Sequence, residues 1–166
     1  MKAFRFGVIA VVAFVILGAW ALRGQPQASE TGFTAAVRDH VRAEQFAPVA
    51  TVAGLPANVR DGLNDLFGGR TLEMADPGQP FQATDVMVTP RLPARRLVSA
   101  GCSTDHCLVY YERGGFARVH HIALFGTADA PARLIHGGVA AGGLADLEQV
   151  RDALVSGKVA VDSKYW

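Results

Sequence analysis

Charge is scarce in this sequence, and the two signs balance. Charged residues make up 19% of the 166 positions, and 16 lysines and arginines face 15 aspartates and glutamates, for a formal charge of +1. A nucleic-acid-binding protein normally carries a basic stripe on one face. We therefore expect no nucleic-acid partner.

Motifs that carry known chemistry are also missing. The sequence contains no nucleophile elbow, phosphate-binding glycine loop, metalloprotease helix or calcium-binding loop. The glycine pairs Gly137-Gly138 and Gly142-Gly143 lack the spacing of a dinucleotide-binding fingerprint. We therefore expect a protein without enzymatic activity and without a cofactor.

Hydrophobic residues make up half of the chain, and many of them gather near its start. Lys2 and Arg5 precede an uncharged run over residues 6–22, which would span about 26 Å as a helix. That length is near the lower limit for crossing a bilayer, and it exceeds the usual apolar core of a cleaved signal peptide. The run is therefore predicted to be a transmembrane anchor, with a signal-peptide core as the alternative, because Ala19-Trp20-Ala21 offers a small-x-small cleavage pattern.

This N-terminal pattern sets the expected domain organisation and location. Residues 1–5 form a cytoplasmic n-region, 6–22 the anchor, 23–32 a polar linker and 33–166 an exported domain. Positive charges stay on the cytoplasmic side of a membrane, so the domain is predicted to be periplasmic, held by a single pass in a bacterial inner membrane. If the leader is cleaved, the domain is instead periplasmic or secreted.

Hydrophobic periodicity predicts three helices in the exported part. Phe33, Val37 and Val41 recur every four residues, a second stripe follows Pro56, and a third helix is expected over residues 144–155.

Between the second and third helices the apolar period changes to two, which is typical of strands. The expected strands are Ala83–Val88, Arg96–Gly101, Cys107–Glu112, Phe116–Phe125 and Ala132–Val139. The last four are joined by connections too short for a crossover, so they are predicted to be antiparallel. The predicted fold is α+β, a four- to five-stranded antiparallel meander with two or three helices packed on one face.

The two cysteines of the chain are separated by four residues. An oxidising compartment normally joins such a pair, and four residues can close a hairpin, so Cys102 and Cys107 are predicted to form a structural disulfide. A redox-active pair is one alternative. A zinc site that includes His106 is the other.

The histidines suggest a second kind of site. A loop over residues 126–131 would place His121 opposite His136, and a tight turn near Gly114 would bring His106 to the same face. Three imidazoles there, near Tyr110, would bind zinc or copper or supply a general base. The alternative is that all three are half-buried strand residues. His120 and His121 should point to opposite faces.

Tyr110 and Arg118 are the remaining candidates, as ligand-binding residues; the alternative for the tyrosine is cross-strand packing.

Three functions follow from these patterns. The first is a membrane-anchored or secreted cell-envelope domain that binds another envelope protein or a small ligand. The second is a histidine-based metal-binding or metal-dependent catalytic domain. The third is a hydrolase or redox enzyme whose site is scattered along the sequence.

Overall fold

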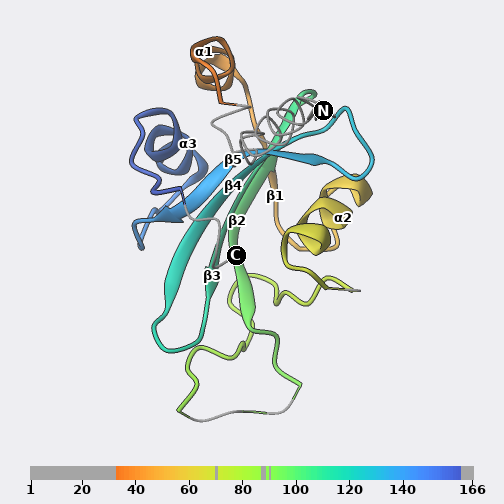
Figure 1. Cartoon of the computed structure of the whole chain (residues 1–166), viewed down its shortest axis with the longest axis vertical. Helices are drawn as coiled ribbons and strands as arrows, with labels where there is room; N and C mark the ends of the chain where they lie inside the picture. Colours follow the sequence, from red (N-terminus) through yellow and green to blue (C-terminus); the bar gives the residue numbers. More distant parts are fainter. Residues whose placement is uncertain (1–32, 70, 87–88, 90, 162–166) are drawn as a thin grey trace, which may run out of the picture.

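The computed structural model describes residues 33–69, 71–86, 89 and 91–161 (Figure 1). The predicted n-region, anchor and linker, residues 1–32, lie outside the described residues. Within the described ranges, no helix combines the length and apolar character needed to cross a bilayer.

A five-stranded antiparallel sheet forms the centre of the molecule (Figure 1). Its strands follow one another in chain order, so the predicted meander is confirmed. The strands are β1 (Ala47–Val49), β2 (Arg95–Cys102), β3 (His106–Arg113), β4 (Val119–Gly126) and β5 (Arg133–Ala140).

Three helices pack on this sheet, as the apolar stripes predict. They are α1 (Ala35–Ala43), α2 (Ala57–Leu66) and α3 (Leu147–Val155). The Thr34 and Asp146 side chains cap α1 and α3 by accepting hydrogen bonds from the backbone N–H three residues ahead. The α+β class is therefore confirmed.

The expectation that the helices cover only one face is wrong. Val41 of α1 and Leu154 of α3 pack with Leu108, Tyr110 and Leu124 on one face of the sheet. The opposite face carries a second core, in which α2 packs on the strand residues that point away from α1 and α3. Its members include Val59, Leu63, Val109, Tyr111 and Phe125.

The reason for the two-sided packing lies in β3 and β4. Residues 107–111 of β3 and 122–125 of β4 are almost continuously apolar, and all of them are buried. A strand that alternates apolar and polar residues needs cover on one face, whereas a continuous apolar run needs it on both. Helices on both faces supply that cover (Figure 1).

Two strand predictions also need correction. No strand forms over residues 83–86, where Thr84 makes only an isolated bridge with Gly115; the rest of the predicted strand includes residues outside the described ranges. The short edge strand β1 was not predicted, because three residues that include Pro48 carry no periodic signal.

The disulfide between Cys102 and Cys107 is present and closes the β2–β3 hairpin. The two cysteines stand directly opposite each other in the strand register, as the predicted hairpin requires. Residues Asp105 and His106 lie inside this covalently closed turn, next to the C-terminal end of α1.

Candidate functional site

The three histidines predicted to share one face are divided between the two faces. His121 pairs with Val139 instead of His136, and His106 pairs with Gly126. His121 stacks on Tyr111 on the α2 face, with ring centroids 5.2 Å apart. The predicted registers are therefore wrong, and the structure does not bring the three imidazoles together.

The β3–β4 register differs because the loop is longer than the expected tight turn, and the β4–β5 register differs because Gly126 pairs with Arg133 and the pairing then shifts within β4. Arg113 pairs with Val119, so residues 114–118 form a five-residue connection. Gly114 accounts for this loop: a Cβ at this position would lie 1.7 Å from the backbone oxygen of Gln82, an approach that only glycine permits. Between β4 and β5 the pairing shifts at Leu124 and Phe125.

His106 and His136 do share the face covered by α1 and α3, but they meet opposite ends of α1. His136 stacks on Phe33, just before the helix, with ring centroids 4.5 Å apart. His106 contacts Glu44, just after the helix. Eleven residues at helical rise separate these two contact points by roughly 16 Å.

The His120 side chain also points to the α1 and α3 face, where it stacks on Tyr110. The prediction that His120 and His121 point to opposite faces of the sheet is therefore confirmed.

The structure instead assembles a different polar cluster at the C-terminal end of α1. We call it the α1 cluster; it comprises His40, Glu44, Asp105 and His106. His106 Nδ1 lies 2.9 Å from Glu44 Oε2, and His40 Nε2 lies 3.2 Å from Glu44 Oε1. Asp105 Oδ2 is 3.0 Å from the same His40 nitrogen.

Burial within the α1 cluster is graded. The Glu44 and His106 side chains are only 8% and 10% exposed, whereas His40 and Asp105 are more than half exposed. The Ser103 hydroxyl donates a hydrogen bond to Glu44 Oε1 at 3.0 Å. The cluster therefore has a fixed inner half and a half that water and solutes can reach.

Tyr110 and Arg118, the predicted ligand-binding residues, belong to one polar network on this face. The buried Glu112 carboxylate accepts a 2.7 Å hydrogen bond from Arg96 Nε and lies 3.6 Å from Arg118 Nε. His120 lies 4.0 Å from Glu112 and stacks on Tyr110.

The Tyr110 hydroxyl is engaged within the protein, since it donates to the carbonyl oxygen of Ala141 at 2.9 Å. Burial raises the pKa of Tyr110 and lowers that of His120, although Glu112 opposes the second shift. The contacts of this network are all made within the protein. Neither Tyr110 nor Arg118 lines the hollow on the opposite, α2 face of the sheet.

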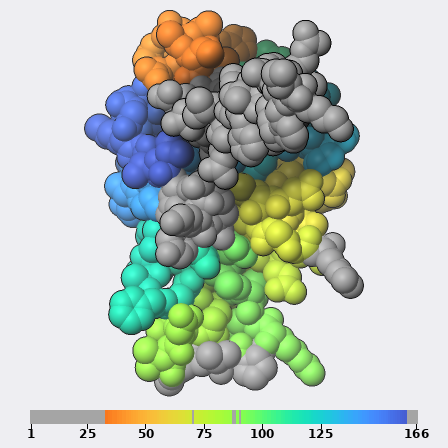
Figure 2. All heavy atoms as spheres, viewed as in Figure 1, coloured from red at the N-terminus to blue at the C-terminus, as the bar shows by residue number. Residues whose placement is uncertain are grey.

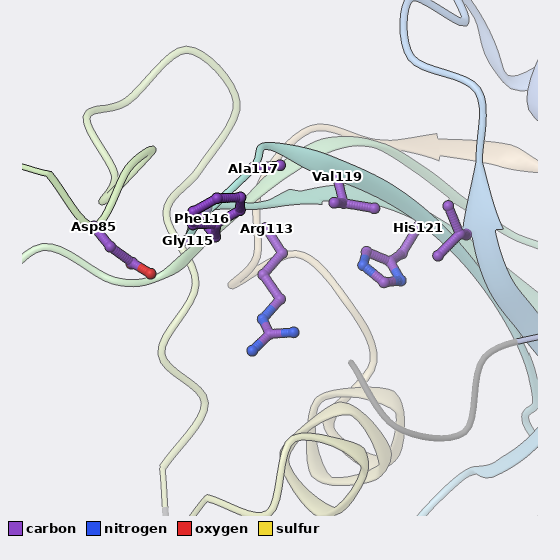
Figure 3. A pocket seen from close by; sticks show the side chains of 9 residues that line it. Asp85, Arg113, Gly115, Phe116, Ala117, Val119 and His121 are labelled. Atoms are coloured by element: carbon purple, nitrogen blue, oxygen red, sulfur yellow. The ribbon is translucent and has the colours of Figure 1, made fainter.

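A hollow of about 390 Å³ opens on the α2 face at the far end of the sheet from α1 (Figure 3). We call it the α2-face hollow. Figure 3 shows the Arg113 and His121 side chains pointing to the same side of the β3–β4 ribbon, with Asp85 across the loop. Its lining residues are Asp85, Arg113, Gly114, Gly115, Phe116, Ala117, Val119, His121 and Val139.

Apolar side chains line part of this hollow, and we call them its apolar rim: Phe116, Val119 and Val139. Three exposed large hydrophobic residues stand out in the described part of the chain: Val86, Phe116 and Val161. Phe116 lines the hollow, Val86 follows Asp85, and Val161 follows Ala160, which pairs with the lining residue Val139. In Figure 2 the loop that carries Phe116 lies at the opposite end of the molecule from α1.

Positive charge accompanies this apolar rim. Arg95 and Arg113 stand opposite each other in the β2–β3 register. Burial raises the pKa of the Tyr111 hydroxyl, and the two arginines oppose that shift. The Arg95 guanidinium lies 3.9 Å from the centre of the Phe67 ring. Two cations therefore lie at the end of the α2 face where the hollow opens.

A wider groove of about 890 Å³ lies along β1, β2 and the start of α3. Its charged lining residues are Asp146, Glu148 and Arg151, and Arg151 lies 3.6 Å from Glu148. The groove is larger than the α2-face hollow, but two carboxylates against one arginine make it the less favourable of the two for an anion.

One residue of the α1 cluster, His106, was predicted as a metal ligand from the sequence, whereas His40, Glu44 and Asp105 were not. A signal for His40 was available: His40 and Glu44 are four residues apart at the end of a predicted helix, which places them on one face. For the α2-face hollow the signal was weaker: of its lining residues only His121 was a predicted site residue, and it was predicted as a metal ligand.

No family model, curated protein sequence or solved structure matches this chain.

Proposed function

We propose that this protein is an exported, non-enzymatic binding domain of the cell envelope, and that its α2-face hollow takes a small carboxylate with an apolar tail. The observation that carries the proposal is that Arg113 and the apolar rim, which includes the exposed Phe116, line one hollow. Export rests on the apolar run over residues 6–22 and on the disulfide.

The apolar part of such a ligand has a matching surface. Phe116, Val119 and Val139 line the hollow; Phe116 is exposed and the two valines are half-buried, and apolar surface left in water is energetically unfavourable. A volume of about 390 Å³ falls in the range of small-molecule sites in proteins, roughly 300–1,000 Å³. An aliphatic or aromatic tail of a few carbons fits this space.

The carboxylate has a partner in Arg113. Guanidinium groups bind carboxylates through two parallel hydrogen bonds, and Arg95 adds a second positive charge nearby. Asp85 lies on the opposite side of the lining and disfavours a second negative group there. These charges favour a monoanion over a dianion.

Calorimetric titration of the full-length protein with hexanoate tests this proposal, with 1-hexanol as the uncharged control. Hexanoate should bind, and hexanol should bind at least tenfold more weakly. Arg113→Gln should weaken hexanoate binding at least tenfold, since a charge-assisted hydrogen bond is worth roughly 1.5–3 kcal/mol. Arg118→Gln, in the loop that follows β3 but not part of the lining, should change it less than twofold.

Equal affinity for hexanoate and hexanol would overturn the carboxylate assignment. Undetectable binding of both, or unchanged binding by the Arg113→Gln protein, would overturn the ligand site altogether. Cell fractionation tests export separately: we expect the protein in the envelope fraction with no free thiol. Intact protein in the cytosol with two free thiols would contradict it.

A further inference from the structure

We propose that the α1 cluster is a binding site for a divalent transition-metal ion of the zinc class, with His40, Glu44 and His106 as ligands and Asp105 as the fourth. This site lies on the opposite face of the sheet from the α2-face hollow, and it is independent of the ligand proposed there. It also differs from the histidine trio that the sequence suggests.

The donor set suits such an ion. Two imidazole nitrogens with carboxylate oxygens are the ligands that zinc binds in proteins, and they suit Cu²⁺ and Ni²⁺ as well. Calcium and magnesium take oxygen ligands, so the two imidazoles disfavour them. The cluster contains no thiolate, because both cysteines are joined in the disulfide.

The spacing of the donor atoms also suits it. One ligand atom each from His40, Glu44 and His106 can be chosen so that all three lie within 4.8 Å of one another. Zinc bonds of about 2.0–2.1 Å in a tetrahedron place neighbouring ligand atoms about 3.3 Å apart. The two contacts that Glu44 Oε1 makes with His106 Nδ1 and His40 Nε2, at 2.9 and 3.2 Å, need to lengthen by only a few tenths of an ångström. The two imidazole nitrogens lie within 4.8 Å of each other and need to approach.

Asp105 lies on the exposed side of this set, outside the three residues whose donor atoms are within 4.8 Å of one another, and reaches a bound ion by a movement of its exposed side chain. Its Oδ2 atom lies 3.0 Å from His40 Nε2, the same nitrogen that faces Glu44. Around a bound ion this carboxylate replaces the fourth water ligand and brings the net charge of the site near zero. Without Asp105 the site would keep the open position that is typical of catalytic zinc.

The supporting contacts keep the ligands in place before any ion arrives. The Ser103 hydroxyl donates to Glu44 Oε1, and it also accepts the backbone N–H of His106 at 3.0 Å. The Thr127 N–H donates to the Asp105 carbonyl oxygen at 2.9 Å. The disulfide closes the turn at Cys107, directly after His106. Such contacts orient metal ligands and raise affinity.

The competing account is that the α1 cluster is only a set of histidine–carboxylate contacts that dock α1 on the hairpin. The two accounts differ in one observable. Replacing the exposed His40 removes a metal ligand but little buried contact, so it should abolish tight metal binding while the fold remains.

The test uses full-length protein without a histidine tag, loaded with zinc, dialysed and measured for metal content. We expect one equivalent of zinc. His40→Ala and His106→Ala should each weaken zinc binding at least tenfold, and Asp105→Asn should weaken it less. The control variants His121→Ala and His136→Ala, which replace two members of the predicted trio outside the α1 cluster, should keep one equivalent.

Cobalt provides a second readout that does not depend on stability. Cobalt bound in place of zinc should give the intense visible absorption of a tetrahedral site, and His40→Ala should remove it while the circular dichroism spectrum stays unchanged. Less than a tenth of an equivalent of zinc would overturn the proposal. Equal losses in the His40→Ala and His121→Ala proteins would also overturn it.

Discussion

The two faces of one sheet carry different chemistry in this molecule. The α1 and α3 face presents imidazoles and carboxylates at the end of α1, whereas the α2 face opens a hollow lined by Arg113, Asp85 and an apolar rim. Adjacent residues such as His120 and His121 serve different faces, because side chains alternate along a strand. Residues that are adjacent in a strand of this protein therefore belong to different faces and different sites. Residues four apart on a helix lie on one face and are better candidates for a shared site.

Both faces should matter for folding, and core truncations should have the largest effects. Leu63→Ala on the α2 face and Leu154→Ala on the α3 face each remove a fully buried side chain. Each should lower the free energy of unfolding by roughly 2–5 kcal/mol, measured by urea denaturation. A change below about 1 kcal/mol in either variant would show that its face contributes little core.

Gly114→Ala should have the next largest effect, because the new Cβ would collide with the backbone of residue 82. We expect a loss of about 3 kcal/mol, together with weaker hexanoate binding, since Gly114 lines the α2-face hollow. Gly78→Ala is the matched control: its φ is +76° but nothing lies within 4 Å, so it should cost about 1 kcal/mol. Equal costs would show that the close approach is unimportant.

The disulfide should have a smaller effect, because it closes a short turn. Cys102→Ala/Cys107→Ala should lower the free energy of unfolding by roughly 2 kcal/mol in urea. The turn carries Asp105 and His106, so zinc affinity should also fall, while hexanoate binding should not change. Loss of hexanoate binding at native stability would show that the two faces are coupled.

Acid should produce the smallest effect, and it should act on the α1 and α3 face. Burial lowers the pKa of His136, and Arg38 lowers it further; burial also lowers the pKa of His120. The folded state therefore binds fewer protons than the unfolded state. The stability that these histidines contribute is complete above about pH 6.5 and is lost as pH falls through their lower folded pKa values.

His136→Phe keeps a ring for Phe33 to stack on but removes the titrating group. Its free energy of unfolding should fall less than that of the parent protein between pH 7.5 and pH 5.5. Urea denaturation at the two pH values measures the difference. An identical fall in both proteins would mean that His136 does not contribute to the acid sensitivity.

Local patterns in the sequence predicted much of this fold. The helical stripes through Val41, Leu63 and Leu154 depend on short-range periodicity, and β2 to β5 were predictable as short apolar segments separated by turn residues. The disulfide was predictable for the same reason, since a short hairpin brings Cys102 and Cys107 together by itself.

The candidate sites depend on contacts that short-range patterns do not contain. Strand register follows from loop conformation, and the β3–β4 loop is set by the approach of Gly114 to residue 82, thirty-two positions away. The α1 cluster needs the β2–β3 hairpin to dock at Glu44, which lies 62 positions from His106. Helix spacing could have paired His40 with Glu44, but not with their partners on the hairpin.

One spectroscopic titration tests the division of chemistry between the two faces most directly. Amide ¹H–¹⁵N spectra of the full-length protein would be recorded during addition of zinc and then of hexanoate. Zinc should shift residues around His40, Glu44 and the Cys102–Cys107 turn, and hexanoate should shift residues 113–121 and Val139. Overlapping sets of shifted residues, or no saturable shifts with either probe, would contradict the account.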